Sequence, residues 1–352
     1  MQENMSFYAR QTCLKCSTAL VFMLFCLTGK SQYNFSAIDG LLTKNQKMLG
    51  GDVAALVYKD GKIIYQKELG DFNIKTTAQI ASCSKWLTAA LVMTFVDEGK
   101  IQLDQKVSDF LPIFETYGKT YITIRQCLSH TTGISDSKGI VMKMLERRKF
   151  ESLEEEVNSF VKREIADNPG KSFFYGNIGL NIAARVLEVV SKKSFETIMR
   201  QRIFVPLEMK NSTFLSDNAP NPSGGATSTA NDYMNFLVMI LNKGMYKDKR
   251  ILSEKAIAEM QSVQTKNTVV KYTPKVAEGY DYGLGEWIEE KDAAGNSTVV
   301  SSPGLFGTWP FIDKCRNYAG IFFIKKLISE EKKELYLELK KKIDEQIASS
   351  CK

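Results

Sequence analysis

A serine and a lysine three positions apart, Ser82 and Lys85, have the residue types and the spacing for nucleophilic catalysis. Residues three apart on a helix lie on the same face, so the two side chains would share its first turn. Burial can lower a lysine pKa from about 10.4 by several units, and a neutral amine can then take the proton of the serine hydroxyl. Ser82 at the helix N-terminus would also lie at the positive end of the helix dipole. The pair therefore predicts a serine nucleophile that works with a lysine base.

The S-x-x-K spacing alone is a weak signal, because it occurs by chance in most proteins of this size. In the alternative interpretation Ser82 only caps the helix and Lys85 extends to water. After Ser82 the chain is apolar nearly all round as far as Val96, which predicts a buried helix, and Gly99 ends it.

The chain has a single histidine, His130. This excludes a multi-histidine metal centre, and a Ser-His-Asp triad would have to use this one residue. The sequence around it, Leu-Ser-His-Thr-Thr-Gly, is typical of a turn after a helix. We expect His130 to pack or to bond the turn, and a general base is the alternative. No metal or organic cofactor is implied.

The first 32 residues have the features of a secretory signal peptide. Arg10 and Lys15 precede a nine-residue apolar run at 19–27, and a polar exit follows it. Nine apolar residues are too few to cross a bilayer, which takes about 20. We expect cleavage near Gln32 and export to the bacterial periplasm or the medium, with no membrane span left in the mature domain, 33–352. A retained anchor is the alternative.

Charge and cysteine content further narrow the class of protein. The net charge is +7, of which the predicted leader carries +2, and the remaining +5 is spread over interleaved Lys and Glu. Such a pattern is not a nucleic-acid-binding footprint. Three of the seven cysteines lie in the leader. The others can pair in an exported protein or remain buried thiols, and the sequence fixes no connectivity. These are Cys83, Cys127, Cys315 and Cys351.

Strand patterns gather at the two ends of the mature chain, and helical periodicity dominates the middle. An Asp-Gly turn at 60–61 joins strands at 54–58 and 63–65 into a hairpin. The helical region runs from about residue 86 to 260, and a last charged helix is expected at 329–348. Four further strands are expected near the C-terminus, at 282–288, 297–301, 307–313 and 318–324.

This order predicts an α/β (α+β) sandwich. Strands from both chain ends form one antiparallel sheet flanked by helices, and an all-helical lobe is inserted between them. The α/β lobe would take residues 37–90 and 280–352, and the helical lobe residues 91–279, all approximately. A ligand site is expected between the lobes.

Further segments follow Ser82 and Lys85 in a characteristic order. They are VDEGKIQLD at 96–104, ITIRQCLSHTTG at 122–133, PGKSFFYGN at 169–177, IFVPLEM at 203–209 and GGATSTA at 224–230. Together they resemble the serine β-lactamase and penicillin-binding-protein superfamily. The resemblance is to its class C β-lactamase-like branch, with the related family VIII-type esterases and D-aminopeptidases. It covers nearly the whole mature chain and implies a β-lactamase/transpeptidase-like fold.

The resemblance also implies roles for individual residues. Ser82 would be the acylated nucleophile and Lys85 its partner. Tyr175 would carry protons to the leaving group and activate the deacylating water, and Asn177 would hold Lys85 and the acyl side chain. A tyrosine beside a lysine ammonium can have its pKa lowered enough to act as a base. Composition alone would make 175–177 a plain turn after Pro-Gly.

The third motif departs from the family. Ser302-Pro303-Gly304 stands where relatives carry Lys-Thr-Gly or His-x-Gly, so a hydroxyl replaces the cation or imidazole. Gly304 would still permit close backbone approach, and the Leu305 amide would join that of Ser82 as an oxyanion hole. Pro303 withholds a strand N–H, which predicts an edge strand facing the cleft.

The resemblance implies an exported serine hydrolase that acts through an acyl-enzyme on small-molecule esters, β-lactams or D-amino-acid amides. Without the motif's cation, neutral short-chain esters are favoured over substrates that carry a carboxylate. The alternative is a non-catalytic, penicillin-binding-protein-like binding or sensor protein. The altered third motif favours that alternative, whereas the intact set of Ser82, Lys85, Tyr175 and Asn177 favours the enzyme.

Overall fold

The computed structural model describes residues 33–136, 147, 149–327 and 330–351. The predicted leader, residues 1–32, lies outside the described residues, so its cleavage and the export of the protein stay predictions. Within the described part, no helix combines the length and the apolar character that crossing a membrane requires.

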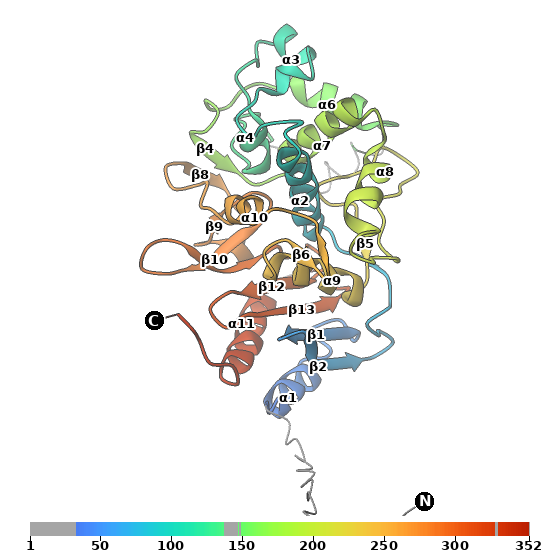
Figure 1. The fold of residues 1–352 in the computed structure, drawn as a ribbon, viewed down its shortest axis with the longest axis vertical. Helices are drawn as coiled ribbons and strands as arrows, with labels where there is room; N and C mark the ends of the chain where they lie inside the picture. The colour runs from blue at the N-terminus through green and yellow to red at the C-terminus, as the bar shows by residue number, and fades with distance from the viewer. Residues whose placement is uncertain (1–32, 137–146, 148, 328–329, 352) are drawn as a thin grey trace, which may run out of the picture. The chain divides into compact units, whose positions relative to one another are not determined.

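One seven-stranded antiparallel sheet joins the two ends of the chain, as predicted. Its strand order is β2-β1-β13-β12-β11-β10-β9, and Figure 1 shows the blue N-terminal strands beside the red C-terminal ones. In the β1–β13 pair, which joins the two chain ends, Val53 lies opposite Ile324. The strands are β1 (Val53–Lys59), β2 (Lys62–Leu69), β9 (Asp281–Tyr282), β10 (Trp287–Lys291), β11 (Ser297–Ser301), β12 (Trp309–Asp313) and β13 (Tyr318–Ile324).

The strand expected at 282–288 is interrupted, because β9 ends at Tyr282 and β10 begins at Trp287. Between them the Gly283 amide donates to the Glu286 carbonyl oxygen over 2.9 Å, which closes a turn. Gly285 has a φ of +81°, and a Cβ there would lie 2.4 Å from the Cβ of Ala89. The chain passes so close to the helix of Ala89 that it leaves the strand conformation at a glycine.

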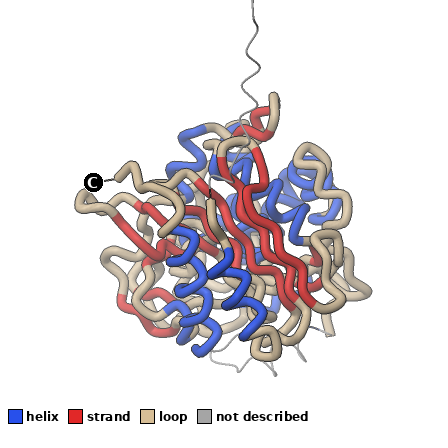
Figure 2. The backbone as a smooth tube through the Cα atoms, turned by 90° about the horizontal axis from the view of Figure 1, so that it is seen from below, coloured by secondary structure: helices blue, strands red, loops and turns tan. Residues whose placement is uncertain are grey.

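Helices cover both faces of the sheet because its strands alternate apolar residues to either side. Val53, Ala55 and Val57 of β1 pack with α1 (Ser36–Lys44) and α11 (Glu330–Asp344). Ala54 and Leu56 face the opposite way, into a larger core shared with α2 (Cys83–Asp97) and α9 (Ala230–Leu241). Figure 2 shows helices lying across the strands.

The middle of the chain is mostly helical, as expected, but it is not confined to a separate lobe, since α9 packs on β1, β12 and β13. Short strand pairs link its loops: β3 (Ala78–Gln79) with β5 (Thr227–Ser228), β4 (Ser172–Phe174) with β8 (Val269–Tyr272), and β6 (Met245–Tyr246) with β7 (Lys249–Arg250). The remaining helices are α3 (Ile113–Thr116), α4 (Ile124–Leu128), α6 (Leu153–Val161), α7 (Ile178–Ser191), α8 (Phe195–Met199), α10 (Glu254–Met260), η1 (Val107–Asp109), η2 (Arg200–Phe204) and η3 (Lys275–Ala277).

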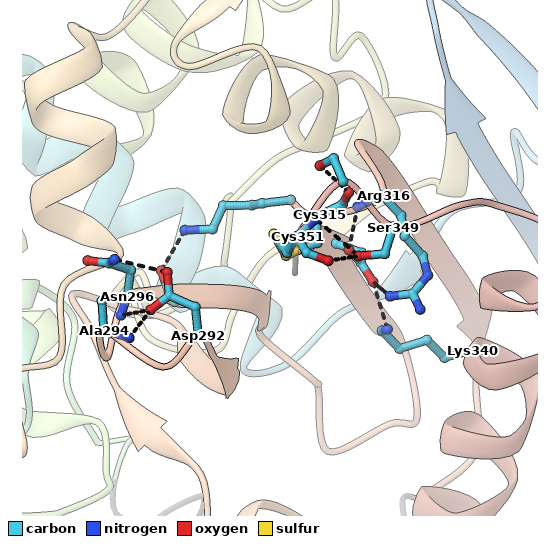
Figure 3. The surroundings of a disulfide bond; sticks show 12 residues. Asp292, Ala294, Asn296, Cys315, Arg316, Lys340, Ser349 and Cys351 are labelled. Carbon is cyan, nitrogen blue, oxygen red and sulfur yellow. Dashed lines mark hydrogen bonds and ion pairs between the residues drawn. A yellow bond between two sulfur atoms is a disulfide. The ribbon is translucent and has the colours of Figure 1, made fainter.

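The four cysteines beyond residue 32 form one disulfide and two buried thiols. Cys315 pairs with Cys351, and Cys83 and Cys127 are free and buried. Figure 3 shows the surroundings of this disulfide. The tail is also held by Ser350, whose amide donates to the Cys315 carbonyl oxygen over 2.7 Å. Disulfides persist mainly in oxidising compartments, and the export of this protein stays a prediction.

Replacing Cys351 by serine is expected to lower the free energy of unfolding by about 4 kcal/mol. The disulfide closes a loop with a sequence separation of 36, and cross-linking a loop of that length restricts the unfolded chain by about this amount. Urea unfolding followed by circular dichroism measures the difference, with Ser349→Ala as the control in the same tail. A change below about 1 kcal/mol would contradict the prediction.

Candidate active site

A tight backbone turn places Ser82 at the start of α2. Ala81 has a φ of +46°, a left-handed conformation that costs a residue with a Cβ on the order of 1 kcal/mol. The turn is closed by the Cys83 amide, which donates to the Ile80 carbonyl oxygen over 3.1 Å. Ser82 is half-buried, whereas the thirteen α2 residues that follow it are all buried. The serine is thus the accessible residue at the start of a helix whose next three turns are enclosed.

Lys85 points back along α2 toward Ser82, as the spacing predicts. Its Nζ lies 3.2 Å from Ser82 Oγ, 3.3 Å from Asn177 Oδ1 and 2.8 Å from the Ser223 carbonyl oxygen. Only 1% of Lys85 is exposed. The alternative of a lysine that extends to water is therefore wrong, and the amine is fixed at hydrogen-bond distance from the serine hydroxyl.

Tyr175 closes the other side of the site within a cluster of aromatic rings. Its ring centroid lies 4.8 Å from Lys85 Nζ, 4.8 Å from the His130 ring and 4.9 Å from the Trp287 ring. Burial raises the pKa of the phenol, and its hydrogen bond with Ser82 opposes this in part. This corrects the expected lowering by the lysine ammonium, since desolvation has the larger effect. At neutral pH Tyr175 is a protonated phenol that can relay a proton.

His130 lies behind Tyr175 and is absent from the described lining of the cleft. Its Nε2 is 3.1 Å from the Tyr282 hydroxyl, and its carbonyl oxygen accepts from the Phe174 amide over 3.0 Å. Burial lowers the pKa of the imidazole well below its usual value, and the Lys85 charge adds to this. The structure thus gives His130 the packing and turn-bonding position that the sequence predicts.

In the third motif, Ser302 binds the backbone of the nucleophile and does not face the cleft. Ser302 is only 2% exposed, and its hydroxyl donates to the Ser82 carbonyl oxygen over 3.2 Å, so it is not presented to a substrate. A Cβ at Gly304 would lie 2.3 Å from the Ile80 carbonyl oxygen, so the close approach there requires glycine. The expected edge strand is wrong: β11 lies between β10 and β12 and ends at Ser301, and Pro303 follows it.

Two backbone amides remain available at the cleft. Those of Ser82 and Leu305 donate no hydrogen bond to another residue in the part of the chain that the structure describes. Both residues line the cleft. Amides of this kind can stabilise the negative oxygen that forms when a hydroxyl attacks a carbonyl group.

The cleft itself has a volume of about 360 Å³. Among its described lining residues the cationic side chains are Lys85 and Arg147, and Arg147 is held by other groups. The Arg147 guanidinium donates to both Glu156 carboxylate oxygens over 2.6 Å and to two backbone carbonyl oxygens. Much of the rest of the lining is apolar: Tyr272, Pro274, Val276, Trp287, Leu305 and Phe306.

The sequence-predicted residues meet at this cleft, with Ser302 behind it. Ser82, Lys85, Tyr175, Asn177, Gly304 and Leu305 all line it. Sequence reasoning missed the Ser223 carbonyl oxygen and Arg147. A carbonyl group carries no side-chain signal, although the Pro- and Gly-rich loop at 220–225 marks a fixed turn. No group of three or more potential metal-ligating side chains occurs among the residues the structure describes.

Comparison with known proteins gives a consistent result. The Beta-lactamase family model matches residues 42–342. A crystal structure of a candidate β-lactamase from Bacteroides dorei DSM 17855 is 30% identical, has a TM-score of 0.79 and covers 89% of this chain and 98% of its own. Protein flp from Staphylococcus aureus (strain MW2) is 28% identical over 174 residues, 46% of this chain and 34% of that protein. Beta-lactamase-like protein 2 from Dictyostelium discoideum is 25% identical over 305 residues, 74% of this chain and 55% of that protein. The chain thus matches only part of the length of these two curated relatives.

Proposed function

Because this chain belongs to the β-lactamase family, we propose that it is a serine hydrolase that works through an acyl-enzyme. The observation that carries the proposal is the 3.2 Å contact between Ser82 Oγ and Lys85 Nζ, with the lysine buried and fixed by Asn177 and Ser223. A serine hydroxyl next to a dry, oriented amine can be deprotonated as it attacks.

In the proposed reaction each of these groups acts once during acylation and once during deacylation. Lys85, as the amine, takes the proton of Ser82 while Oγ bonds to the substrate carbonyl carbon. The amides of Ser82 and Leu305 hold the resulting oxyanion. The proton passes through the Tyr175 hydroxyl to the leaving group as its bond to carbon breaks, which leaves an acyl-Ser82. Water then attacks the acyl group by the reverse sequence and restores the serine hydroxyl.

The lining favours neutral substrates among esters, β-lactams and D-amino-acid amides. A substrate carboxylate would need a cation, and Lys85 and Arg147 already bind protein groups. A charge-assisted hydrogen bond contributes about 1.5–3 kcal/mol, against about 0.5–1.5 kcal/mol for a neutral one. Replacement of the third motif's cation by Ser302 therefore corresponds to roughly a tenfold loss in kcat/KM for anionic substrates.

We expect measurable hydrolysis of short-chain acyl esters and weak or absent hydrolysis of penicillins and cephalosporins. The measurement is kcat/KM for a p-nitrophenyl ester and for a chromogenic cephalosporin on one preparation. Ser82→Ala protein provides the background rate for both substrates. A clear preference for the cephalosporin would overturn the substrate assignment and make β-lactam hydrolysis the activity.

One observation favours a second candidate, a binding or sensor protein without turnover. The cationic residue of the third motif is replaced by Ser302, whose hydroxyl binds the Ser82 backbone. A protein of this kind would be acylated once by a penicillin or a p-nitrophenyl ester and would hold the acyl adduct without releasing product. Mass spectrometry of the labelled protein over time separates this outcome from turnover.

A further inference from the structure

A continuous series of buried hydrogen bonds connects α6 with the catalytic lysine. Asn181 of α7 donates through Nδ2 to Glu156 Oε2 over 2.9 Å, and its Oδ1 accepts from the Ser223 amide over 3.1 Å. The Ser223 carbonyl oxygen then accepts from Lys85 Nζ over 2.8 Å. Glu156 is 1% exposed, and Asn181 and Ser223 are fully buried. None of these bonds is in contact with bulk water.

A buried carboxylate needs compensation, and Glu156 has it. Arg147 donates to both of its oxygens, and the Arg163 charge lies close enough to act on it. Arg163 in turn pairs with Asp136 over 3.2 Å. Burial raises the pKa of the Glu156 carboxyl, and the Arg147 guanidinium opposes that shift. Ion pairs of this kind contribute little net stability, so a role in fixing geometry is the stronger explanation for this one.

The loop that carries Ser223 is held at several points. Arg147 donates to the carbonyl oxygens of Ala219 and Pro220 over 2.7 and 3.1 Å, and Thr88 Oγ1 donates to that of Pro222 over 2.6 Å. The side chain that binds the backbone amide of Ser223 itself is Asn181. Asn181 therefore sets the position of the residue whose carbonyl oxygen receives Lys85.

From this arrangement we propose that Glu156 and Asn181 are positioning residues for Lys85, acting through the backbone of Ser223. The inference deepens the proposed function and rests on it. Glu156 fixes the amide of Asn181, Asn181 fixes Ser223, and the Ser223 carbonyl oxygen holds the lysine amine within reach of Ser82. A lysine released from this carbonyl would leave the 3.2 Å contact with Ser82 Oγ for part of the time.

Asn181→Leu removes both hydrogen bonds of residue 181 while keeping a side chain of similar size. We expect the rate of Ser82 acylation to fall about 10- to 100-fold, with KM for a neutral ester little changed, because the substrate cleft is untouched. The acid limb of the pH–rate profile should move to lower pH. The Ser223 carbonyl oxygen stabilises the ammonium form of Lys85, and the variant weakens that contact. The matched control is Asn235→Leu on α9, which removes a hydrogen bond to the Leu207 carbonyl oxygen and should keep the wild-type rate and pH profile.

Asn181→Asp gives a signature that lost packing would not produce. The new carboxyl can still accept from the Ser223 amide, and at lower pH it can share one proton with Glu156 in place of the amide bond. As pH rises the shared proton leaves and the two carboxylates repel. We expect acylation to fall on the alkaline side, a limb absent from the wild type, while circular dichroism at each pH shows folded protein.

Fluorophosphonate labelling of Ser82, followed by mass spectrometry, tests the proposed function and the positioning role separately. If wild-type protein does not label at Ser82, the proposed function fails. If wild type labels and folded Asn181→Leu labels within twofold of its rate, or folded Asn181→Asp shows the wild-type pH profile, the positioning role is overturned and the proposed function stands.

Discussion

Replacing Ser82 by alanine is expected to abolish covalent labelling by a fluorophosphonate and to reduce ester hydrolysis by about 10⁴-fold or more. Its hydroxyl contacts Lys85, and Ser82 lines the same cleft as Leu305, whose amide is available for an oxyanion. Alanine removes the atom that bonds to the substrate and leaves the backbone of the turn intact. Intact-mass spectrometry and ester kinetics measure the two effects.

Two controls decide what a loss of labelling means. Ser84→Ala removes a buried serine from the same helix, whose Oγ accepts from the Ala226 amide over 3.0 Å, and should leave Ser82 reactive. His130→Ala tests the single imidazole, and folded protein should still label. A folded but unreactive His130→Ala variant would mean that a histidine acts as the base and that the lysine mechanism is wrong.

Lys85→Arg is expected to lower the acylation rate by orders of magnitude although the positive charge remains. Arginine stays protonated in proteins, so it cannot accept the Ser82 proton. Its planar guanidinium also cannot reproduce the three contacts that one lysine nitrogen makes with Ser82, Asn177 and Ser223. Stopped-flow acylation with a chromogenic ester measures the loss.

The pH profile adds a second test of the base. Acylation of the wild type should rise with pH, because the base must be unprotonated. That limb should not belong to an imidazole, since burial keeps the His130 pKa well below its usual value, nor to Tyr175, whose pKa burial raises. Lys119→Arg changes a buried lysine that bonds the Tyr117 carbonyl oxygen and should leave rate and profile unchanged. Near-wild-type activity in Lys85→Arg would sink the assignment.

Local signals predicted the sheet well. The hairpin around residues 60–61 and the strands at 297–301 and 318–324 lie where the pattern placed them, because each strand is a short run of strand-forming residues bounded by turn residues. The interruption at 283–286 could not be read in this way. Gly285 is needed there because α2 passes beneath it, which is a contact between distant parts of the chain.

In the site, too, features with a local sequence signal were predicted, and features set by contacts between distant residues were not. The Ser82 and Lys85 contact follows from helical spacing, and the sequence motif indicated Tyr175 and Asn177. The raised pKa of Tyr175 depends on burial by distant aromatic residues, and the inward orientation of Ser302 depends on the path of the strand end. Neither has a local signal. The pairing of Cys315 with Cys351 likewise depends on where α11 ends.

The pairing of β1 with β13 has a consequence for how the chain is made. Val53 meets Ile324, so the sheet cannot close until almost the whole polypeptide has left the ribosome. Until then α2, which is buried on all sides in the finished protein, has no sheet to pack against. Closing so long a loop is entropically costly, and topologies rich in distant contacts fold slowly. The chain therefore cannot reach its folded state through most of its synthesis, because the strand that completes the β1–β13 pair comes near the end. An unfolded polypeptide is the form that can pass through a narrow translocation channel.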